Sequence, residues 1–152
     1  MRAVLSLITA LTLALPALAQ DVESPPDAEE IPVAELLILD AAETTLDAHL
    51  WASRPIVIFA DTPRDPRFQE QLDLLMERPE PLLERDVVVI FDSDPAANSE
   101  VRQALRPRGF SLVLIQRDGN VAFRKPYPWD VREITRAIDN LPMRIEEMGL
   151  SQ

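Results

Sequence analysis

The segment from Asp61 to Arg67 (Asp-Thr-Pro-Arg-Asp-Pro-Arg) holds the residue types best suited to bind or act on a small molecule. It follows the apolar run Pro55–Ala60 and opens an amphipathic helix. Open α/β sheets bind ligands at this kind of position, and helix N-termini attract anions. Two arginines in the segment could pair with such an anion. The candidate ligand-binding residues are therefore Asp61, Thr62, Arg64 and Arg67.

The same segment also fits a capped turn that binds nothing. Asp65 is a suitable N-cap and Pro66 suits the first helical position, while the two arginines balance two aspartates. Thr62 could act as a nucleophile only beside a base. His49 is the only histidine and lies far upstream, so a Ser-His-Asp arrangement has little support. We assign no catalytic residue.

Cysteine is absent from all 152 residues. A thiolate is the nucleophile in thiol exchange and in peroxide reduction, so the chain cannot perform either reaction. Without disulfides, the stability of the fold must come from packing alone. We therefore expect neither a thiol oxidoreductase nor a peroxidase.

Two further patterns bear on metal binding. The sequence Asp92-Ser93-Asp94 resembles the opening of a calcium loop, but Ala96 and Ala97 stand where another ligand and a glycine are required. A strand-to-helix loop with an N-cap explains the pattern better. A single histidine argues against a zinc site, and we predict neither a metal nor a cofactor.

The turn at residues 126–129 (Pro-Tyr-Pro-Trp) places two aromatic side chains beside Arg124 and Lys125. Tyr, Trp and Arg dominate the hot spots of protein interfaces, so Tyr127 and Trp129 are candidate partner contacts. The alternative is that Trp129 covers the start of the last helix. The sequence does not choose between the two.

The formal net charge is −11, and the acidic residues are unevenly spread. Residues 20–50 contain nine carboxylates and no Lys or Arg, whereas the chain from Trp51 onward has 17 carboxylates and 14 basic residues. Nucleic acids and anionic membranes need a basic surface, so we expect neither as a partner. A protein or a small anionic ligand remains as the expected partner.

The first residues have the pattern of a secretory signal peptide. Arg2 precedes the apolar run Ala3–Leu15, and Ala17-Leu18-Ala19 offers a small-residue cleavage site. The run is shorter than the roughly 20 residues that a spanning helix needs. We predict a periplasmic or secreted protein without membrane contact after cleavage. Its parts are a signal peptide (1–19), an acidic disordered linker (20–32) and one domain (33–152).

From residue 55 the hydrophobic pattern alternates between strands and helices in the order β-α-β-α-β-β-α. Strands separated by helices favour parallel pairing through right-handed crossovers. A hairpin turn at Asp118-Gly119 or Gly119-Asn120 predicts an antiparallel end. The predicted strands are 33–39 at the sheet edge, 55–60, 87–91, 112–115 and 121–124, and the predicted helices begin at Asp65, Asp94 and Asp130.

The spacing of apolar residues also predicts which side chains face the core. Trp51 is expected to bury its ring near the first core strand. The first helix should turn Phe68, Leu72, Leu75 and Met76 inward, the second Val101, Ala104 and Leu105, and the last Val131, Ile134, Ile138 and Leu141.

This order of elements is that of thioredoxins and peroxiredoxins. Residues 108–121 look like the thioredoxin segment that enters the third core strand and turns the hairpin. Thioredoxins have a cis-proline at the position of Ser111 and cysteines in the loop that corresponds to residues 61–66, and both features are absent here. The resemblance implies an α/β, thioredoxin-like three-layer sandwich. Its sheet should be mixed, mostly parallel, and should end in an antiparallel hairpin.

The chain also resembles a family of secreted domains of unknown function with a peroxiredoxin-related fold, over about residues 46–148. This resemblance implies fold and secretion but no activity. We expect a non-enzymatic binding or interaction module without thiol redox activity. The alternative is an unconventional enzyme or an anion-binding protein that uses the loop Asp61–Arg67. The matching residues are Trp51, Arg54–Ala60, Asp65–Phe68, Gln71, Glu84–Val89, Asp118-Gly119, Ile138–Arg144 and Glu147-Met148.

Overall fold

The structure is a computed structural model that describes residues 35–150. The predicted signal peptide, the predicted acidic linker and the first residues of the predicted domain lie outside this range. Within the range, no helix is long and apolar enough to cross a membrane.

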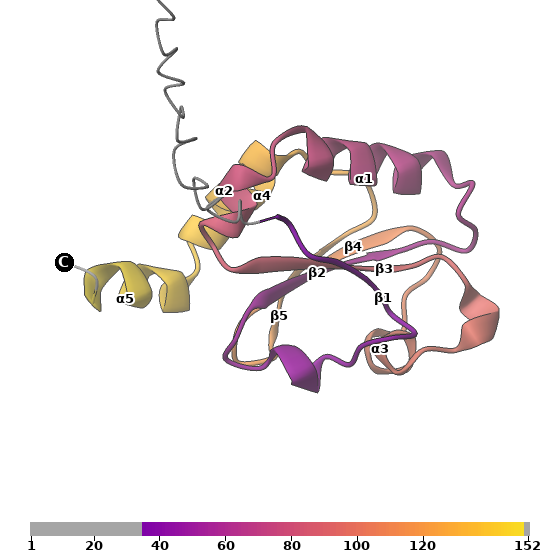
Figure 1. Ribbon diagram of the computed structural model, residues 1–152, viewed down its shortest axis with the longest axis horizontal. Coiled ribbons are helices and arrows are strands. Elements are labelled where there is room, and N and C mark those ends of the chain that lie inside the picture. The colour runs from indigo at the N-terminus through magenta and orange to yellow at the C-terminus, as the bar shows by residue number, and fades with distance from the viewer. Residues whose placement is uncertain (1–34, 151–152) are drawn as a thin grey trace, which may run out of the picture. The chain divides into compact units, whose positions relative to one another are not determined.

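Five strands form one mixed sheet in the described part of the chain. They are β1 (Ile38–Asp40), β2 (Arg54–Phe59), β3 (Val87–Asp92), β4 (Ser111–Ile115) and β5 (Val121–Lys125). Their order across the sheet is β1-β3-β2-β4-β5 (Figure 1). The predicted edge strand is present as β1, but only residues 38–40 pair with β3.

The sequence predicts parallel pairing for strands linked by helices, which is right for β2 and β3 and wrong for β4. β4 begins with Ser111 opposite Phe59, the last residue of β2. The chain therefore leaves β3 and enters β4 at the same end of the sheet. The intervening helix α3 (Glu100–Leu105) has six residues, about 9 Å, and does not carry the chain back. β4 and β5 form the predicted antiparallel hairpin.

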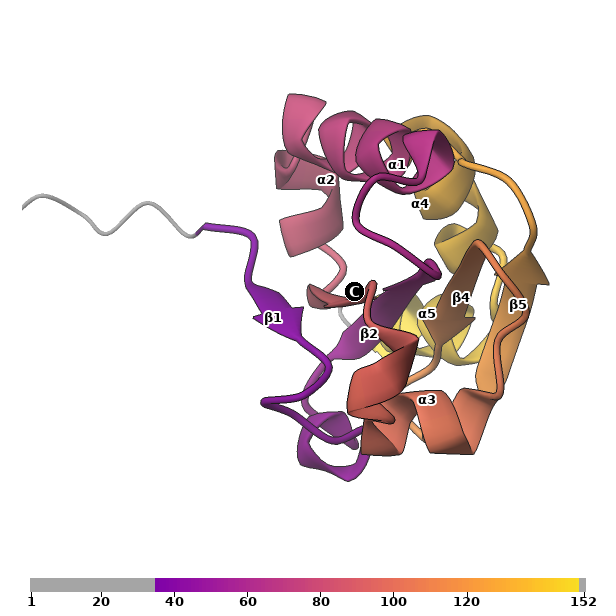
Figure 2. The same cartoon turned by 90° about the vertical axis from the view of Figure 1, so that its right-hand side faces the viewer.

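Helices cover both faces of the sheet and confirm the three-layer sandwich. α1 (Pro66–Glu77), α2 (Glu80–Leu83) and α4 (Val131–Asp139) lie on one face, and α3 lies on the other, as Figure 2 shows. Side chains of β2 alternate between the two layers, because successive residues of a strand point to opposite faces. Ile56 and Ile58 pack under α1 and α4, whereas Val57 and Phe59 pack with residues such as Val101 of α3.

Short polar side chains start the helices. Asp65 caps α1, and Asp130 caps α4 in a capping box with Glu133, both as predicted. Asp94 caps only the 3₁₀ turn Pro95–Ala97, so the prediction of a helix from this residue is wrong. Asn98 then takes a left-handed conformation, and Ser99 caps α3. α2 and the full length of α5 (Pro142–Leu150) are absent from the predicted elements.

Three predicted core positions are exposed. On α1, Met76 is exposed and Gln71 is fully buried instead. Gln71 can be buried because its side-chain amide exchanges hydrogen bonds of 2.9 and 2.8 Å with the backbone of Trp129. Ala104 faces solvent because α3 is short and packs through Val101. The third is Trp51, whose side chain is 68% exposed.

The backbone at Trp51 explains its exposure. Its φ angle is 62°, in the left-handed region, and its N–H donates to the carbonyl of Arg117 at 2.7 Å. This hydrogen bond ties the segment before β2 to the β4–β5 turn and leaves the indole at the surface. Gly119 completes the turn with φ of 85°, and a Cβ there would lie 2.8 Å from Leu50.

Candidate binding site

The loop from Asp61 to Arg67 connects β2 to α1, where the sequence predicts a site. Asp65 accepts a hydrogen bond of 2.9 Å from the backbone N–H of Arg67. The guanidinium of Arg67 donates to the same carboxylate at 3.2 and 3.0 Å. It also lies over the ring of Phe110, 5.3 Å from the centroid. Asp65 and Arg67 therefore satisfy each other.

The loop offers no obvious general base. The hydrogen bond from the Arg67 side chain holds the pKa of Asp65 below its ordinary value, so this carboxylate is ionised at neutral pH and is a weak base. The backbone N–H groups of Phe68 and Gln69 donate to the carbonyl of Asp65 at 3.0 and 3.1 Å. Pro66 has no N–H, so the donors of the first turn of α1 are already occupied.

Asp61, Thr62 and Arg64 are exposed in the same loop. The hydroxyl of Thr62 accepts from the backbone N–H of Arg64 at 3.3 Å. The guanidinium of Arg64 forms no ion pair with any described residue, which distinguishes it from Arg67. The structure thus brings the four predicted residues into one loop but leaves one cation, Arg64, available to a ligand.

His49 is far from this loop. Its ring nitrogens lie 3.0 Å from the hydroxyl of Thr44 and 3.2 Å from that of Ser53, and burial lowers its pKa. Ser53 precedes β2 and Asp61 follows it. The six residues of β2 separate the two ends by about 20 Å. His49 therefore cannot serve Thr62 as a base.

Phe110 also lines an open cleft. The cleft has a volume of about 360 Å³ and is lined by Arg106, Arg108, Phe110, Ser111, Arg124 and Pro126. Among the described residues, no carboxylate forms an ion pair with any of these three arginines. One of them, Arg124, donates to the carbonyl of Leu105 at 2.9 Å. We call this feature the arginine cleft.

Sequence reasoning missed the arginine cleft because its residues come from two separate segments. Arg106 and Arg108 precede β4, and Arg124 lies on β5. The pairing of β4 with β5, in which Val113 faces Arg124, brings the segments together. The available signal was Arg106-Pro107-Arg108, which ends three residues before the predicted strand 112–115.

The two candidate partner contacts differ in burial. Tyr127 is 52% exposed. Trp129 is half-buried against Phe123, with ring centroids 5.1 Å apart, and the Lys125 ammonium lies 4.2 Å from the Trp129 ring centroid. Trp129 therefore contributes to the fold at the start of α4, and Tyr127 is the more accessible of the two. Contact with a partner stays a prediction for both.

Asp92 ties two strand ends together instead of opening a calcium loop. Its carboxylate accepts from the hydroxyl of Ser99 at 2.6 Å and from Arg102 at 2.7 and 3.0 Å. Arg102 also donates to the carbonyl of Ala60 at 2.9 Å, so it joins the ends of β2 and β3. The described residues contain no group of three His, Asp or Glu residues that could hold a metal ion.

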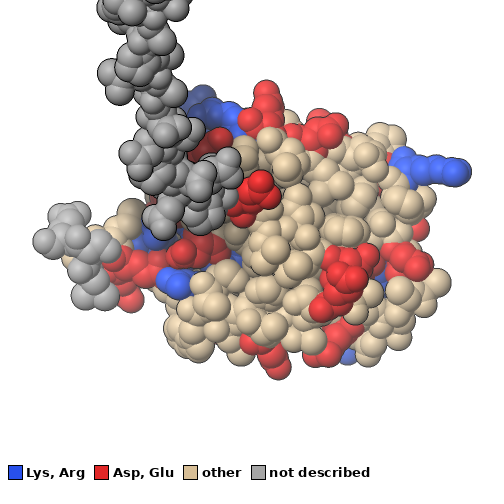
Figure 3. All heavy atoms as spheres, in the orientation of Figure 1, with Lys and Arg blue, Asp and Glu red and all other residues tan. Residues whose placement is uncertain are grey.

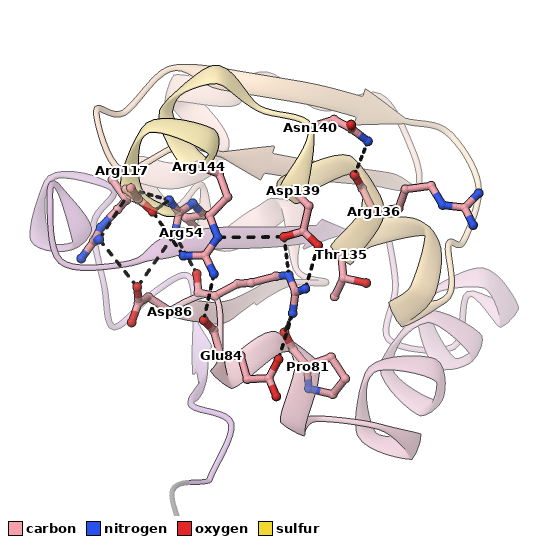
Figure 4. A network of polar contacts seen from close by, with 12 residues as sticks. Arg54, Pro81, Glu84, Asp86, Arg117, Thr135, Arg136, Asp139, Asn140 and Arg144 are labelled. Atoms are coloured by element: carbon pink, nitrogen blue, oxygen red, sulfur yellow. Dashed lines mark hydrogen bonds and ion pairs between the residues drawn. The ribbon is translucent and has the colours of Figure 1, made fainter. Parts of the chain in front are cut away.

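A second group of arginines lies at the opposite end of β2, where Arg54 is buried and Arg85, Arg117 and Arg144 are half-buried (Figure 4). Arg54 is 1% exposed, and its guanidinium donates to both carboxylate oxygens of Glu147 at 2.6 and 2.5 Å. It also donates to the carbonyl of Arg85 at 2.9 Å. Arg144 and Arg117 lie 3.4 and 3.6 Å from the same Glu147 carboxylate. The carboxylate of Glu147, on α5, therefore lies within ion-pair distance of three arginines.

A neighbouring ion pair extends this group. Arg85 donates to both oxygens of Asp139 at 2.8 and 2.7 Å and to the carbonyl of Pro81 at 2.7 Å. Its hydrogen bond lowers the pKa of Asp139. Burial raises the pKa of Glu147, but the hydrogen bond and charge of Arg54 outweigh burial, and the net shift is downward. We call Arg54, Arg85, Asp139, Arg144 and Glu147, with Arg117, the buried arginine network.

The buried arginine network has a structural role that the sequence analysis did not assign. Most of its members belong to the residues that carry the resemblance to secreted domains of unknown function. The signal was an arginine directly before the apolar run of β2, a position where a charge needs a partner.

Fold and loop together define a thioredoxin-like α/β domain whose β2–α1 loop holds an ion-paired turn and no thiol. The chain belongs to the family described as "Domain of unknown function (DUF4174)", which matches residues 45–147. No curated protein matches it.

Two solved structures are similar in fold. The reduced 2-Cys peroxiredoxin of Plasmodium vivax has a TM-score of 0.53 and 15% identity, with 69% of this chain and 85% of that chain covered. Chloroplastic thioredoxin z has a TM-score of 0.52 and 18% identity, with 70% and 93% covered. At these identities the likeness concerns the fold alone. The described residues contain no cis peptide bond, so Ser111 differs from a thioredoxin cis-proline in geometry as well as in type.

Proposed function

We propose that the protein is a non-enzymatic binding module that keeps a thioredoxin-like scaffold and binds its ligand or partner beside the start of β4. The observation that carries the proposal is the arginine cleft, an open surface whose three cations lack carboxylate partners among the described residues. Exposed Tyr127 follows Pro126 at the rim of this cleft. Unpaired cations and an exposed aromatic ring are typical of binding surfaces.

The chemistry available to the loop Asp61–Arg67 supports binding over catalysis. The sequence contains no thiol. Asp65 has a lowered pKa because Arg67 pairs with it, and His49 lies about a strand length from Thr62. A nucleophile without an adjacent base is weak.

The alternative is an unconventional enzyme or an anion-binding protein that uses Asp61, Thr62, Arg64 and Arg67. The observation in its favour is the guanidinium of Arg64, which forms no ion pair within the described residues. Arg67 and the N–H groups in the first turn of α1 already form hydrogen bonds within the protein. The loop therefore has fewer donors available to an anion than the arginine cleft has.

We further propose that the protein works in the periplasm or outside the cell. The support is the apolar run Ala3–Leu15 followed by Ala17-Leu18-Ala19. N-terminal sequencing of exported protein tests the proposal, and we expect the mature chain to begin at Gln20. Recovery of a full-length chain in the membrane fraction would contradict it.

Native mass spectrometry of protein isolated from its own host tests the binding function. We expect a non-covalent companion, a protein or a small molecule, that is lost under denaturing conditions. Replacing Arg106, Arg108 and Arg124 by Gln should release it. The matched control replaces Arg78, Arg132 and Arg136 by Gln, three exposed arginines outside the cleft, and should retain the companion.

Two results would count against the binding function. The first is the absence of a companion from the native spectrum. The second is chemical conversion of a bound molecule that a Thr62→Val variant abolishes, which would favour the enzyme instead.

A further inference from the structure

We infer that the arginine cleft binds a multiply charged oxyanion, either the phosphate group of a small phosphomonoester or a di- or tricarboxylate. This inference rests on the proposed binding function and names the chemistry of its ligand. The cleft of about 360 Å³ falls within the range of small-molecule sites.

The first argument is charge compensation. In the described part of the chain, six arginines form ion pairs with carboxylates: Arg54, Arg67, Arg85, Arg102, Arg117 and Arg144. The three arginines of the cleft do not, although the chain carries a net charge of −11. Arg64, Arg78, Arg132 and Arg136 also form no ion pair with a described residue, but the cleft brings three such arginines around one hollow. The face drawn in Figure 3 has many acidic side chains and few basic ones. Three like charges around one hollow repel each other, and a bound anion relieves that repulsion.

The second argument is Ser111 at the base of the cleft. Its side chain lines the cleft while the residue is only 4% exposed. Its hydroxyl makes no hydrogen bond with the described residues. The hydroxyl oxygen is not fully buried, so this donor and acceptor is accessible to a ligand oxygen in the cleft. Its position on β4, at the centre of the sandwich, fixes it in place.

The third argument is the support behind the arginines. Arg106 follows α3 directly in a left-handed conformation, with its N–H bonded to the carbonyl of Arg102 at 2.8 Å. Arg124 is held by the carbonyl of Leu105. Arg67 lies over the Phe110 ring but does not line the cleft, so its charge stays with Asp65. Guanidinium groups present paired donors that match phosphate and carboxylate oxygens.

Other exposed arginines do not offer the same environment. Arg132 and Arg136 form no ion pair with a described residue either, but they line one surface together with the carboxylates of Asp130 and Glu133. Arg78 and Arg132 line a hollow of about 390 Å³ with Pro81, Val131 and Thr135, which contains two arginines where the cleft contains three. These arginines therefore supply the control.

The test is titration of the mature protein with inorganic phosphate, glycerol 3-phosphate or citrate at constant ionic strength, followed by NMR shifts and by melting temperature. Chloride at matched ionic strength serves as the blank. We expect saturable binding at one site, with shifts centred on Phe110 and Ser111, and a rise in melting temperature. If the protein binds glycerol 3-phosphate more tightly than citrate, the ligand class is a phosphomonoester. If it binds citrate more tightly, the ligand class is a polycarboxylate. Equal affinities show that the cleft recognises the shared negative charge.

Variants locate the site. Each Arg→Gln change in the cleft should weaken binding roughly tenfold or more, and the triple variant R106Q/R108Q/R124Q should not bind. The control triple R78Q/R132Q/R136Q should bind within about twofold of the parent, because additive charge effects outside the site are screened. S111A should weaken binding several-fold without moving the ligand-free melting temperature.

No saturable binding by any of the three anions, or equal loss in the two triple variants, overturns the inference. In either case a protein companion in the native mass spectrum would leave the binding function standing, so the two failures are distinguishable. Circular dichroism of each ligand-free variant confirms that loss of binding is not loss of fold.

Discussion

The buried arginine network and the arginine cleft are made of the same side chain but differ in how its charge is compensated. In the network, the 1%-exposed Arg54 contacts Glu147 at 2.6 and 2.5 Å, and the pKa of that carboxyl is lowered. In the cleft, Arg106, Arg108 and Arg124 are exposed and have no carboxylate partner among the described residues. The comparison teaches that arginine density alone does not indicate a site, and it makes the three uncompensated arginines of the cleft the group to test.

The largest effect is expected from Glu147→Gln. This change leaves Arg54 buried without its carboxylate, and breaking a buried ion pair by removing one partner costs about 3–5 kcal/mol of folding free energy. Urea unfolding followed by circular dichroism measures it. Glu146→Gln removes the same charge from the exposed neighbour and should change stability little. A loss for Glu147→Gln no larger than for this control would show that the network is not a stabilising feature.

The next largest effect is expected in the pH dependence of stability, to which the carboxylates of the buried arginine network contribute. The pKa values of Asp139 and Glu147 lie below their ordinary values of 3.8 and 4.5. Their contribution is therefore present above the unfolded pKa and is lost as pH falls through the folded pKa. We expect the urea midpoint to fall as pH drops below about 5, with a shallower fall in Glu147→Gln. A midpoint that rises on acidification would contradict this.

A smaller effect is expected from Asp65→Ala in the loop between β2 and α1. Loss of the N-cap to Arg67 should cost about 0.5–2 kcal/mol. Asp61→Ala is the control, since Asp61 caps no helix. Equal losses in thermal unfolding would mean that the cap contributes nothing and that the loop is held by other contacts.

The smallest effect on stability is expected from R106Q/R108Q/R124Q. These side chains are exposed, so each change should stay within about 0.5 kcal/mol. Chemical unfolding in low and high salt measures the difference. A triple variant that unfolds like Glu147→Gln would place the cleft in the same structural role as the network and would remove the contrast.

Much of the fold could be predicted from local signals. Apolar runs such as Val87–Phe91 identify strands covered on both faces, and Asp65 and Asp130 mark helix starts through their own hydrogen bonds. These features depend on neighbours in sequence. The direction of β4 was not predictable in that way, because it depends on where a six-residue helix returns the chain.

The candidate sites also differ in whether their residues are neighbours in sequence. The loop Asp61–Arg67 is continuous in sequence, so its residues could be listed, but the pairing of Arg67 with Asp65 left only Arg64 without an ion pair. The cleft joins Arg106 to Arg124 across a hairpin, and the network joins residues 93 positions apart. Trp51 is a large aromatic residue and was therefore predicted to lie in the core. Its left-handed backbone conformation explains why it is exposed.

The long sequence separation between Arg54 and Glu147 also determines when, during synthesis of the chain, their ion pair can form. A growing chain exposes Arg54 well before it contains residue 147, so β2 cannot obtain its closest counter-charge until synthesis of the domain is almost complete. Any product that stops short of α5 leaves Arg54 with only the more distant carboxylate of Asp86, at 3.9 Å. The last helix, α5, therefore supplies the final and closest counter-charge of β2.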